Sequence, residues 1–250
     1  MKTIIHRAVL ILGIVATLSS AVCAHATNVV PGISVDIGGG EGGVADSLKI
    51  LFMLTIIALA PSILIMMTSF TRIVIVLSFV RNAIGLQQTP PNQVLVGLAL
   101  FLSLFIMSPV INKIETEAYT PLENGEITEE QALQKATDPL REFMLKQTKN
   151  EDLKLFLDLS KEETPTDVQN LEMKIVIPAF ITSELKRAFT IGFMIFLPFL
   201  IIDMVVASVL MSMGMVMLPP SMISLPFKIL LFVLVGGWDL VVKTLVLSFN

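Results

Sequence analysis

The chain is poor in the side chains on which most enzyme chemistry depends. Its 250 residues contain one cysteine, Cys23, and two histidines, His6 and His25, so all three lie within the first 26 positions. Beyond them no Ser-His-Asp set can form, and CxxC, HExxH and Walker A patterns are absent from the sequence. These absences exclude metal hydrolases, ATPases and folds held by disulfides. We therefore predict a protein that is not an enzyme and that uses no cofactor and no metal site.

Charged residues are also scarce, at 15% against the roughly 25% of an ordinary soluble domain. Hydrophobic residues make up 54% of the chain, and the mean hydropathy is +0.82. No basic patch is visible, so a nucleic-acid partner is not expected. The composition predicts an all-α, multi-pass membrane protein built from kinked helical hairpins.

The first 26 residues have the layout of a secretory signal peptide. Lys2 and Arg7 give a positive start, residues 8–18 form a short apolar core, and Ala24-His25-Ala26 is a small-residue cleavage site. The alternative is an uncleaved first transmembrane helix. Residues 27–47, which include the glycine-rich GGGEGG stretch, are predicted to be a flexible linker.

Residues 48–111 are predicted to form the first helical hairpin. The apolar pattern of residues 48–81 is too long for one simple span and contains Pro61, so we expect either a kinked helix or a span followed by a second helix. The GLQQTPPN stretch of residues 85–92 reads as a turn. A second apolar segment, residues 94–111, completes the hairpin.

Residues 112–185 are the one region with the composition of a soluble protein. They hold sixteen of the 21 acidic residues and eight of the 17 basic ones. Thr128 and Gln131 have capping-box spacing, and Asp138-Pro139 could begin a fresh helix. The pattern predicts a small acidic helical subdomain, whose charge is either a solvated face or a specific site for cations.

Residues 186–250 are predicted to form a second helical hairpin with a methionine-rich loop. A polar turn around Ser183 to Arg187 leads into the apolar run 188–210, and a last apolar segment covers residues 222–247. That last segment carries Lys228, so it should face protein or water as much as lipid.

The loop between these segments has a methionine at every second position: Met211, Met213, Met215 and Met217. A period of two puts side chains on one face of an extended segment but scatters them around a helix. Gly214 and Pro219-Pro220 favour the extended form. Three interpretations follow: a soft apolar gasket, ordinary core filling, and Cu(I) binding by thioethers as in a small multi-pass copper or ion transporter.

Two ionisable residues stand out within the apolar segments. Asp203 is either functional in itself or paired with Lys228 or Arg72 from a neighbouring helix or subunit. Arg72 has no acid nearby in the sequence, so it either snorkels to an interface or forms a buried interhelical pair. We treat both as candidates for assembly.

Cleavage of the leader fixes a topology. Residue 27 would lie outside, the turn after Arg81 inside, the acidic subdomain outside the cytoplasm, and the methionine run on the cytoplasmic side. Arg81 agrees with the positive-inside rule, whereas Lys186 and Arg187 fall on the outer side. These helices are therefore not all expected to be ordinary lipid-facing spans.

Two longer blocks carry a resemblance to a known family. They read SFTRIVIVLSFVRNAIGLQQTPPNQV, from Ser69 to Val94, and PAFITSELKRAFTIGFMIFLPFLIIDMVVASVLMSMGMVMLPP, from Pro178 to Pro220. The chain resembles the FliP family, membrane proteins of the flagellar type III export gate, over essentially its whole length after the leader. Related injectisome proteins share the second block, so an injectisome homologue is an alternative.

The resemblance implies a homo-oligomeric ring assembled with FliQ and FliR, near FlhA and FlhB, at the basal body in the bacterial inner membrane. Such a ring forms the channel entrance through which unfolded flagellar proteins are exported. The resemblance also implies a pore gasket, at Met211, Met213, Met215 and Met217. Val216 stands where many relatives have a further methionine, which implies a thinner seal. Helices stacked out of the bilayer plane would account for the charges in the last segment.

Overall fold

The computed structural model describes residues 43–160, 171–215 and 217–249, which are helical and contain no β-strand. The predicted all-α class is confirmed. The chain divides into two compact units, Met1–Thr55 and Ile56–Asn250. The predicted signal peptide lies outside the described residues. In the first unit, residues 43–47, expected in the linker, instead begin helix α2 (Gly43–Met66).

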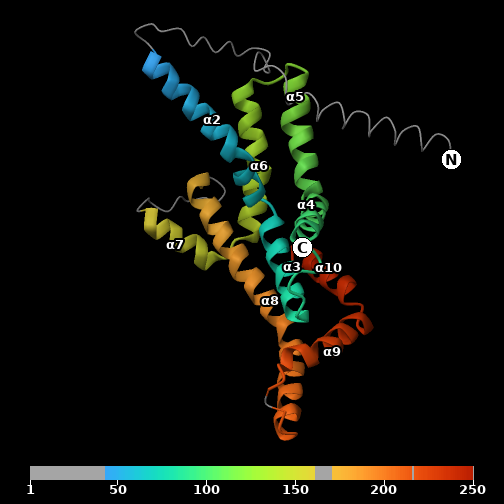
Figure 1. The fold of residues 1–250 in the computed structure, drawn as a ribbon. Coiled ribbons are helices and arrows are strands. Elements are labelled where there is room, and N and C mark those ends of the chain that lie inside the picture. The colour runs from blue at the N-terminus through green and yellow to red at the C-terminus, as the bar shows by residue number, and fades with distance from the viewer. Residues whose placement is uncertain (1–42, 161–170, 216, 250) are drawn as a thin grey trace, which may run out of the picture. The chain divides into compact units, whose positions relative to one another are not determined.

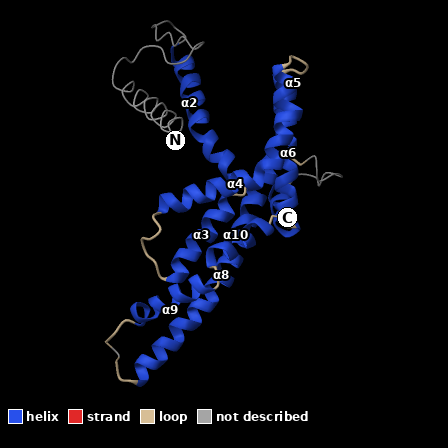
Figure 2. Ribbon diagram, turned by 90° about the vertical axis from the view of Figure 1, so that its right-hand side faces the viewer, coloured by secondary structure: helices blue, strands red, loops and turns tan. Residues whose placement is uncertain are grey.

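The second unit holds the rest of α2 and all later helices (Figure 1). In chain order these are α3 (Phe70–Ile84), α4 (Asn92–Ile114), the π-helical turn η2 (Glu115–Tyr119), α5 (Thr120–Glu123), α6 (Glu129–Gln147), α7 (Asn150–Ser160), α8 (Met173–Ser212), α9 (Pro220–Leu234) and α10 (Gly237–Leu247). The ribbon coloured by secondary structure shows the same helices with short loops between them (Figure 2).

Among the described residues, three helical stretches are long and apolar enough to cross a bilayer: Leu48–Met66, Asn92–Glu123 and Met173–Ser212. The pair α9 and α10, bent by 63°, would be a fourth if it forms one broken span. The multi-pass membrane class is therefore supported by the helices themselves. At 1.5 Å per residue, the 40 residues of α8 extend about 60 Å, roughly twice a hydrocarbon core.

The long apolar pattern of residues 48–81 is a span followed by a second helix, one of the two predicted forms. The break lies at residues 67–69, and Pro61 stays inside α2. Ser69 donates a hydrogen bond to Ser103 of α4 at 3.1 Å. The predicted turn at residues 85–92 is also present, with Gly85 in the left-handed conformation at the end of α3.

Helix α3 lies at the centre of the main core. Its buried side chains recur at helical spacing, as Ile73, Val76, Leu77, Val80 and Ile84, and meet buried residues of α4, α8 and α10. Gly192 of α8 permits a close approach, because a Cβ there would lie 2.5 Å from the ring of Phe79. Helix α3 is thus enclosed by other helices, although it is too short to span a membrane.

A second core joins α6 and α7 to the first half of α8 around Met144, Leu153 and Phe180. The capping box of Thr128 and Gln131 is confirmed at the start of α6. The fresh helix expected at Asp138-Pro139 is wrong, because α6 runs through Pro139, which is buried.

Both predicted limits of the acidic subdomain fall inside helices. Helix α4 continues past residue 111 to Ile114, and α8 runs without interruption from Met173 to Ser212. The polar turn predicted around Ser183 to Arg187 is therefore wrong. Ser183 and Glu184 are buried against neighbouring helices, so these polar residues serve packing inside a helix rather than ending one.

Candidate functional site: buried ion pairs and a methionine-rich hairpin tip

Arg72 of α3 is fully buried, and each of its five guanidinium N–H groups has an acceptor. Nε donates to Glu184 Oε2 at 2.9 Å, and Nη2 donates to Glu184 Oε1 and to Gln147 Oε1, the latter at 3.2 Å. Nη1 donates to the backbone oxygen of Ser248 at 2.8 Å and to its Oγ at 2.9 Å. The ion pair with Glu184 is two-pronged, the geometry in which Arg binds carboxylate most strongly.

The residues after α10 complete this network. Phe249 is buried, and its ring lies 3.7 Å from the Cζ atom of Arg72. Gln147 donates from Nε2 to the backbone oxygen of Phe249 at 2.8 Å. Arg72 thereby joins α3, α6, α8 and residues 248–249. Of the two interpretations from the sequence, the buried interhelical pair is correct, with Glu184 as partner.

Asp203 of α8 is bonded to α9 rather than to Arg72. Lys228 donates to Asp203 Oδ2 at 2.6 Å, and Ser224 Oγ donates to Oδ1 at 2.5 Å. Lys228 and Ser224 are buried, while the Asp203 side chain is about one-third exposed. The contact ties together the two helices that carry the methionine run.

A third ion pair, not predicted from the sequence, joins α7 to α8. Asp152 is buried, accepts a hydrogen bond from Ser183 Oγ at 2.6 Å, and is paired with Lys186. Burial alone would favour the neutral acid, but the bonds from Lys186 and Ser183 outweigh it and hold the pKa of Asp152 below its ordinary value. The pair accounts for Lys186, which the expected topology places on the outer side against the positive-inside rule.

The methionine run forms the tip of the α8–α9 hairpin, but it is not an extended segment. Met211 is in the last turn of α8, and Gly214 follows with φ +75°. Gly214 N–H bonds to Met211 O at 3.1 Å, and Met215 N–H bonds to Leu210 O at 3.0 Å. These bonds form a Schellman motif, whose left-handed residue is usually glycine. The predicted extended backbone is therefore wrong.

The methionine side chains nevertheless project from the tip. Met211, Met213 and Met217 are 64%, 65% and 96% exposed, and Met215 is partly buried. Filling of this chain's own core, one of the earlier interpretations, does not fit such exposure.

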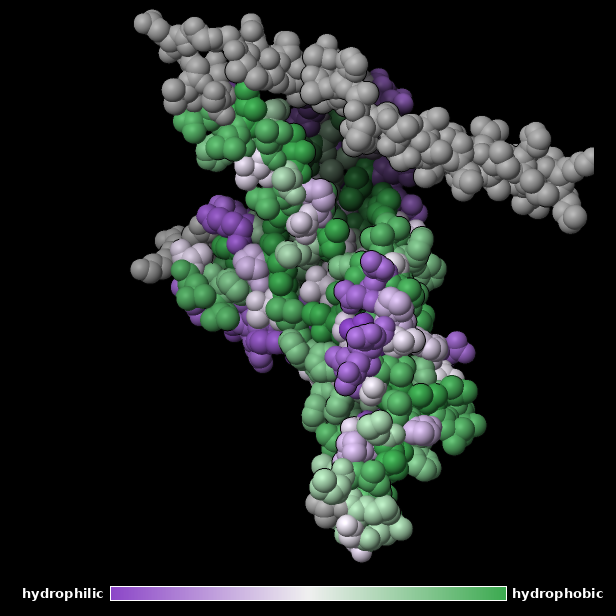
Figure 3. Space-filling model, in the orientation of Figure 1, coloured by the Kyte–Doolittle hydropathy of each residue, from purple (hydrophilic) through white to green (hydrophobic). Residues whose placement is uncertain are grey.

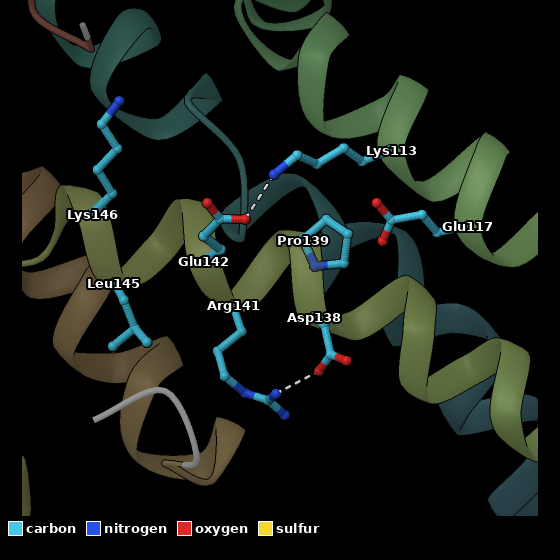
Figure 4. A pocket seen from close by; sticks show the side chains of 8 residues that line it. All are labelled: Lys113, Glu117, Asp138, Pro139, Arg141, Glu142, Leu145 and Lys146. Atoms are coloured by element: carbon cyan, nitrogen blue, oxygen red, sulfur yellow. Dashed lines mark hydrogen bonds and ion pairs between the residues drawn. The ribbon is translucent and has the colours of Figure 1, made fainter. Parts of the chain in front are cut away.

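A polar cavity of about 650 Å³ lies elsewhere, between the end of α4, η2 and α6. It is lined by both signs of charge (Figure 4). Lys113 pairs with Glu142 at 2.9 Å, and Arg141 pairs with Asp138 at 2.7 Å. Since most of these charges neutralise one another, the cavity is an ion-paired surface between helices rather than a site for one kind of ion.

Sequence comparison decides the family of this chain. The FliP family model matches residues 53–245, which include both ion pairs of α8 with α3 and α9 and the methionine tip. The chain belongs to the FliP family. The flagellar biosynthetic protein FliP of Bacillus subtilis is 59% identical over 206 residues, which are 82% of this chain and 93% of that protein.

Other FliP proteins match over similar lengths. FliP of Aquifex aeolicus is 50% identical and covers 86% of this chain and 91% of its own length. FliP of Caulobacter vibrioides is 46% identical over 244 residues, covering 98% of this chain and 92% of its own. The resemblance inferred from the two sequence blocks is confirmed.

Proposed function

We propose that this FliP-family chain is a subunit of the flagellar type III protein export gate, and that copies of it form the channel entrance for unfolded flagellar proteins. The gate would sit at the basal body in the bacterial inner membrane, with FliQ and FliR as partners and with FlhA and FlhB nearby. Family membership and the apolar helices support this proposal. The observation that carries the channel role is the exposed methionine tip.

The tip has the properties that a reversible seal requires. Methionine is unbranched, apolar and soft, so side chains from several copies can close a pore against ions and part around a passing polypeptide. The base of the hairpin is held by the Asp203–Lys228 pair, while the tip has a left-handed glycine and three exposed methionines. A fixed base with soft side chains at its end suits a gate that opens repeatedly.

The exposed apolar stripe of α8 supports assembly with other helices. Phe189 and Phe193 are one turn apart on α8, as are Ile201 and Val205, and each of these side chains is more than half exposed, so the outer surface of the helix is apolar there. Such a face requires lipid or protein contact. We assign it to contacts within the proposed homo-oligomer and with FliQ and FliR.

The test replaces Met211, Met213, Met215 and Met217 together with Ala in cells that make the complete export apparatus. Shorter side chains should open the closed pore, so cells should leak small ions and grow slowly while the complex still assembles. Leu at the same four positions keeps the bulk and should restore most of the seal. Ala at Met53 of α2 and at Met204, two exposed methionines outside the hairpin tip, is the matched control.

An assembled Ala variant that leaks no more than its parent contradicts the gasket. Stoichiometric Cu(I) on the purified parent, lost in the Leu variant, would instead support a copper transporter. Normal flagellar assembly in cells that lack this chain would contradict the export role itself.

A further inference from the structure

A separate apolar groove lies between α8, α9 and α10, with a volume of about 570 Å³. It occupies the angle where α9 and α10 bend by 63° beside α8 (Figure 1). Its walls include Ile191, Ile195, Phe199, Leu231, Leu240 and Val241. No charged side chain lines it, and this end of the molecule shows a largely apolar surface (Figure 3).

The two polar residues of the groove, Thr190 and Thr244, lie at the same end. Arg72 binds both Glu184 and Ser248, so the α8 segment just before Thr190 meets the chain just after Thr244. At the opposite end the rings of Phe199 and Phe232 lie 6.4 Å apart. The groove is therefore apolar along its length, with a hydroxyl-bearing end next to the Arg72 network.

Two cations flank this hydroxyl-bearing end. Arg187 precedes Thr190 by three residues, and Lys243 follows the groove residue Leu240 by three, so each lies on the same helix face one turn further along. Lys243 is exposed and makes no ion pair within the described residues, although Asp239 is one turn away on α10. Arg187 donates a 3.4 Å hydrogen bond to Gln147 and lies close enough to Glu184 to interact with its charge.

This end also marks a change in the character of α8. Four of the five charged residues of α8 lie at or before Arg187, and the 25 residues beyond it carry one charge, Asp203, in an otherwise largely apolar sequence. Basic residues between membrane helices, at the edge of the apolar segment, are the residues that bind anionic lipid headgroups. An acyl chain would fill the groove, and a phosphate would meet the two cations.

We propose that the groove holds one acyl chain of an anionic phospholipid whose phosphate lies at Arg187 and Lys243. Burial of the acyl chain supplies affinity, because apolar surface of both the chain and the groove is removed from water. The two cations supply the preference for a negative headgroup, since Arg and Lys bind phosphate through charge-assisted hydrogen bonds. Neither role depends on the proposed export function.

The test uses the full chain in bilayer discs of equal parts phosphatidylglycerol and phosphatidylcholine. After transfer to detergent, native mass spectrometry counts the lipids that stay bound. We expect one retained lipid per chain, enriched in phosphatidylglycerol. K243Q should reduce that enrichment about fivefold, which corresponds to about 1 kcal/mol per cation at an anionic surface. K154Q, at an exposed lysine of α7, should leave it unchanged.

A second variant tests the groove separately from the charges. L240W fills the cavity from a half-exposed position and should remove the retained lipid of either headgroup, while L234W, outside the groove, should not. Circular dichroism verifies that both variants fold. Retention of the two lipids in the bulk ratio by the parent, unchanged retention in L240W, or a protein segment found in the groove in place of lipid would each overturn the proposal.

Discussion

The buried pair of Arg72 and Glu184 allows a sharp test of what holds the helices together. We consider Glu184→Ala, Arg72→Met and the double variant Arg72→Met with Glu184→Leu. Both native side chains are fully buried, so water cannot replace a lost partner. In Glu184→Ala the guanidinium keeps its three bonds to Ser248 and Gln147 but loses two acceptors and its counter-charge.

Removing one member of a buried pair typically costs about 3–5 kcal/mol, because the other charge stays buried and unpaired. Measured against a total stability of about 5–15 kcal/mol, Glu184→Ala should remove a fifth or more of it. The double variant removes both charges and roughly keeps the volume. Replacement of a buried pair by apolar residues is often near neutral, so the double variant should be more stable than Glu184→Ala.

The assay is equilibrium unfolding of the purified chain in detergent, followed by fluorescence. Trp238 is the only tryptophan, and it packs edge-on against Phe232 at 5.4 Å between ring centroids. The control removes the exposed pair of Lys113 and Glu142, which should change the unfolding midpoint little. If Glu184→Ala shifts the midpoint no more than this control, or if the double variant loses the sum of the single losses, the pair is not energetically coupled.

Three further predictions concern the hairpin and α7. Asp203→Ala leaves Lys228 buried without a counter-charge and should lower the free energy of unfolding by about 1–3 kcal/mol, whereas Asp203→Asn, which keeps an oxygen acceptor, should lose less in the same assay. Because the pKa of Asp152 is lowered in the fold, its pair with Lys186 stabilises the protein fully above the ordinary Asp pKa, and this stabilisation is lost as pH falls through the lowered pKa. The free energies of unfolding of the parent and of Asp152→Asn should therefore converge only in strong acid. Convergence near neutral pH would contradict that sign. Gly214→Ala should cost about 1–2 kcal/mol because of the left-handed backbone, and Gly214→Asn less, as thermal unfolding would show; equal losses would refute the backbone explanation.

Local features of the fold were predictable because short stretches of sequence determine them. The capping box at Thr128 and the turn that begins at Gly85 follow from neighbouring residues alone. Membrane-length apolar runs likewise identify the spans. Lys228 was one of the two partners expected for Asp203, and that pair is present. The partner of Arg72 was not predictable, since Glu184 is 112 residues away and periodicity does not say which helices meet.

The errors have the same origin. Ser183 and Glu184 seemed to be a polar turn because their partners, Asp152 and Arg72, could not be seen from the neighbouring residues. The methionine spacing suggested an extended segment, but Gly214 ends α8 with a left-handed turn instead. A glycine two or three residues past an apolar helical run was the available signal for that turn. For Arg72, a lone cation in a short apolar helix was the only hint of a distant acid.

The acceptors of Arg72 also set an order of events during biosynthesis. Ser248, which accepts two of its five N–H bonds, is translated 176 residues after Arg72. At about 5–20 residues per second, α3 waits roughly ten to thirty-five seconds for the last of its partners. At least until Glu184 is made, 112 residues after Arg72, the guanidinium has no counter-charge and must remain in water, at the lipid headgroups or beside the translocation machinery, because hydrocarbon cannot solvate it. Helix α3 therefore packs into the core late, although it is synthesised before most of the helices that enclose it.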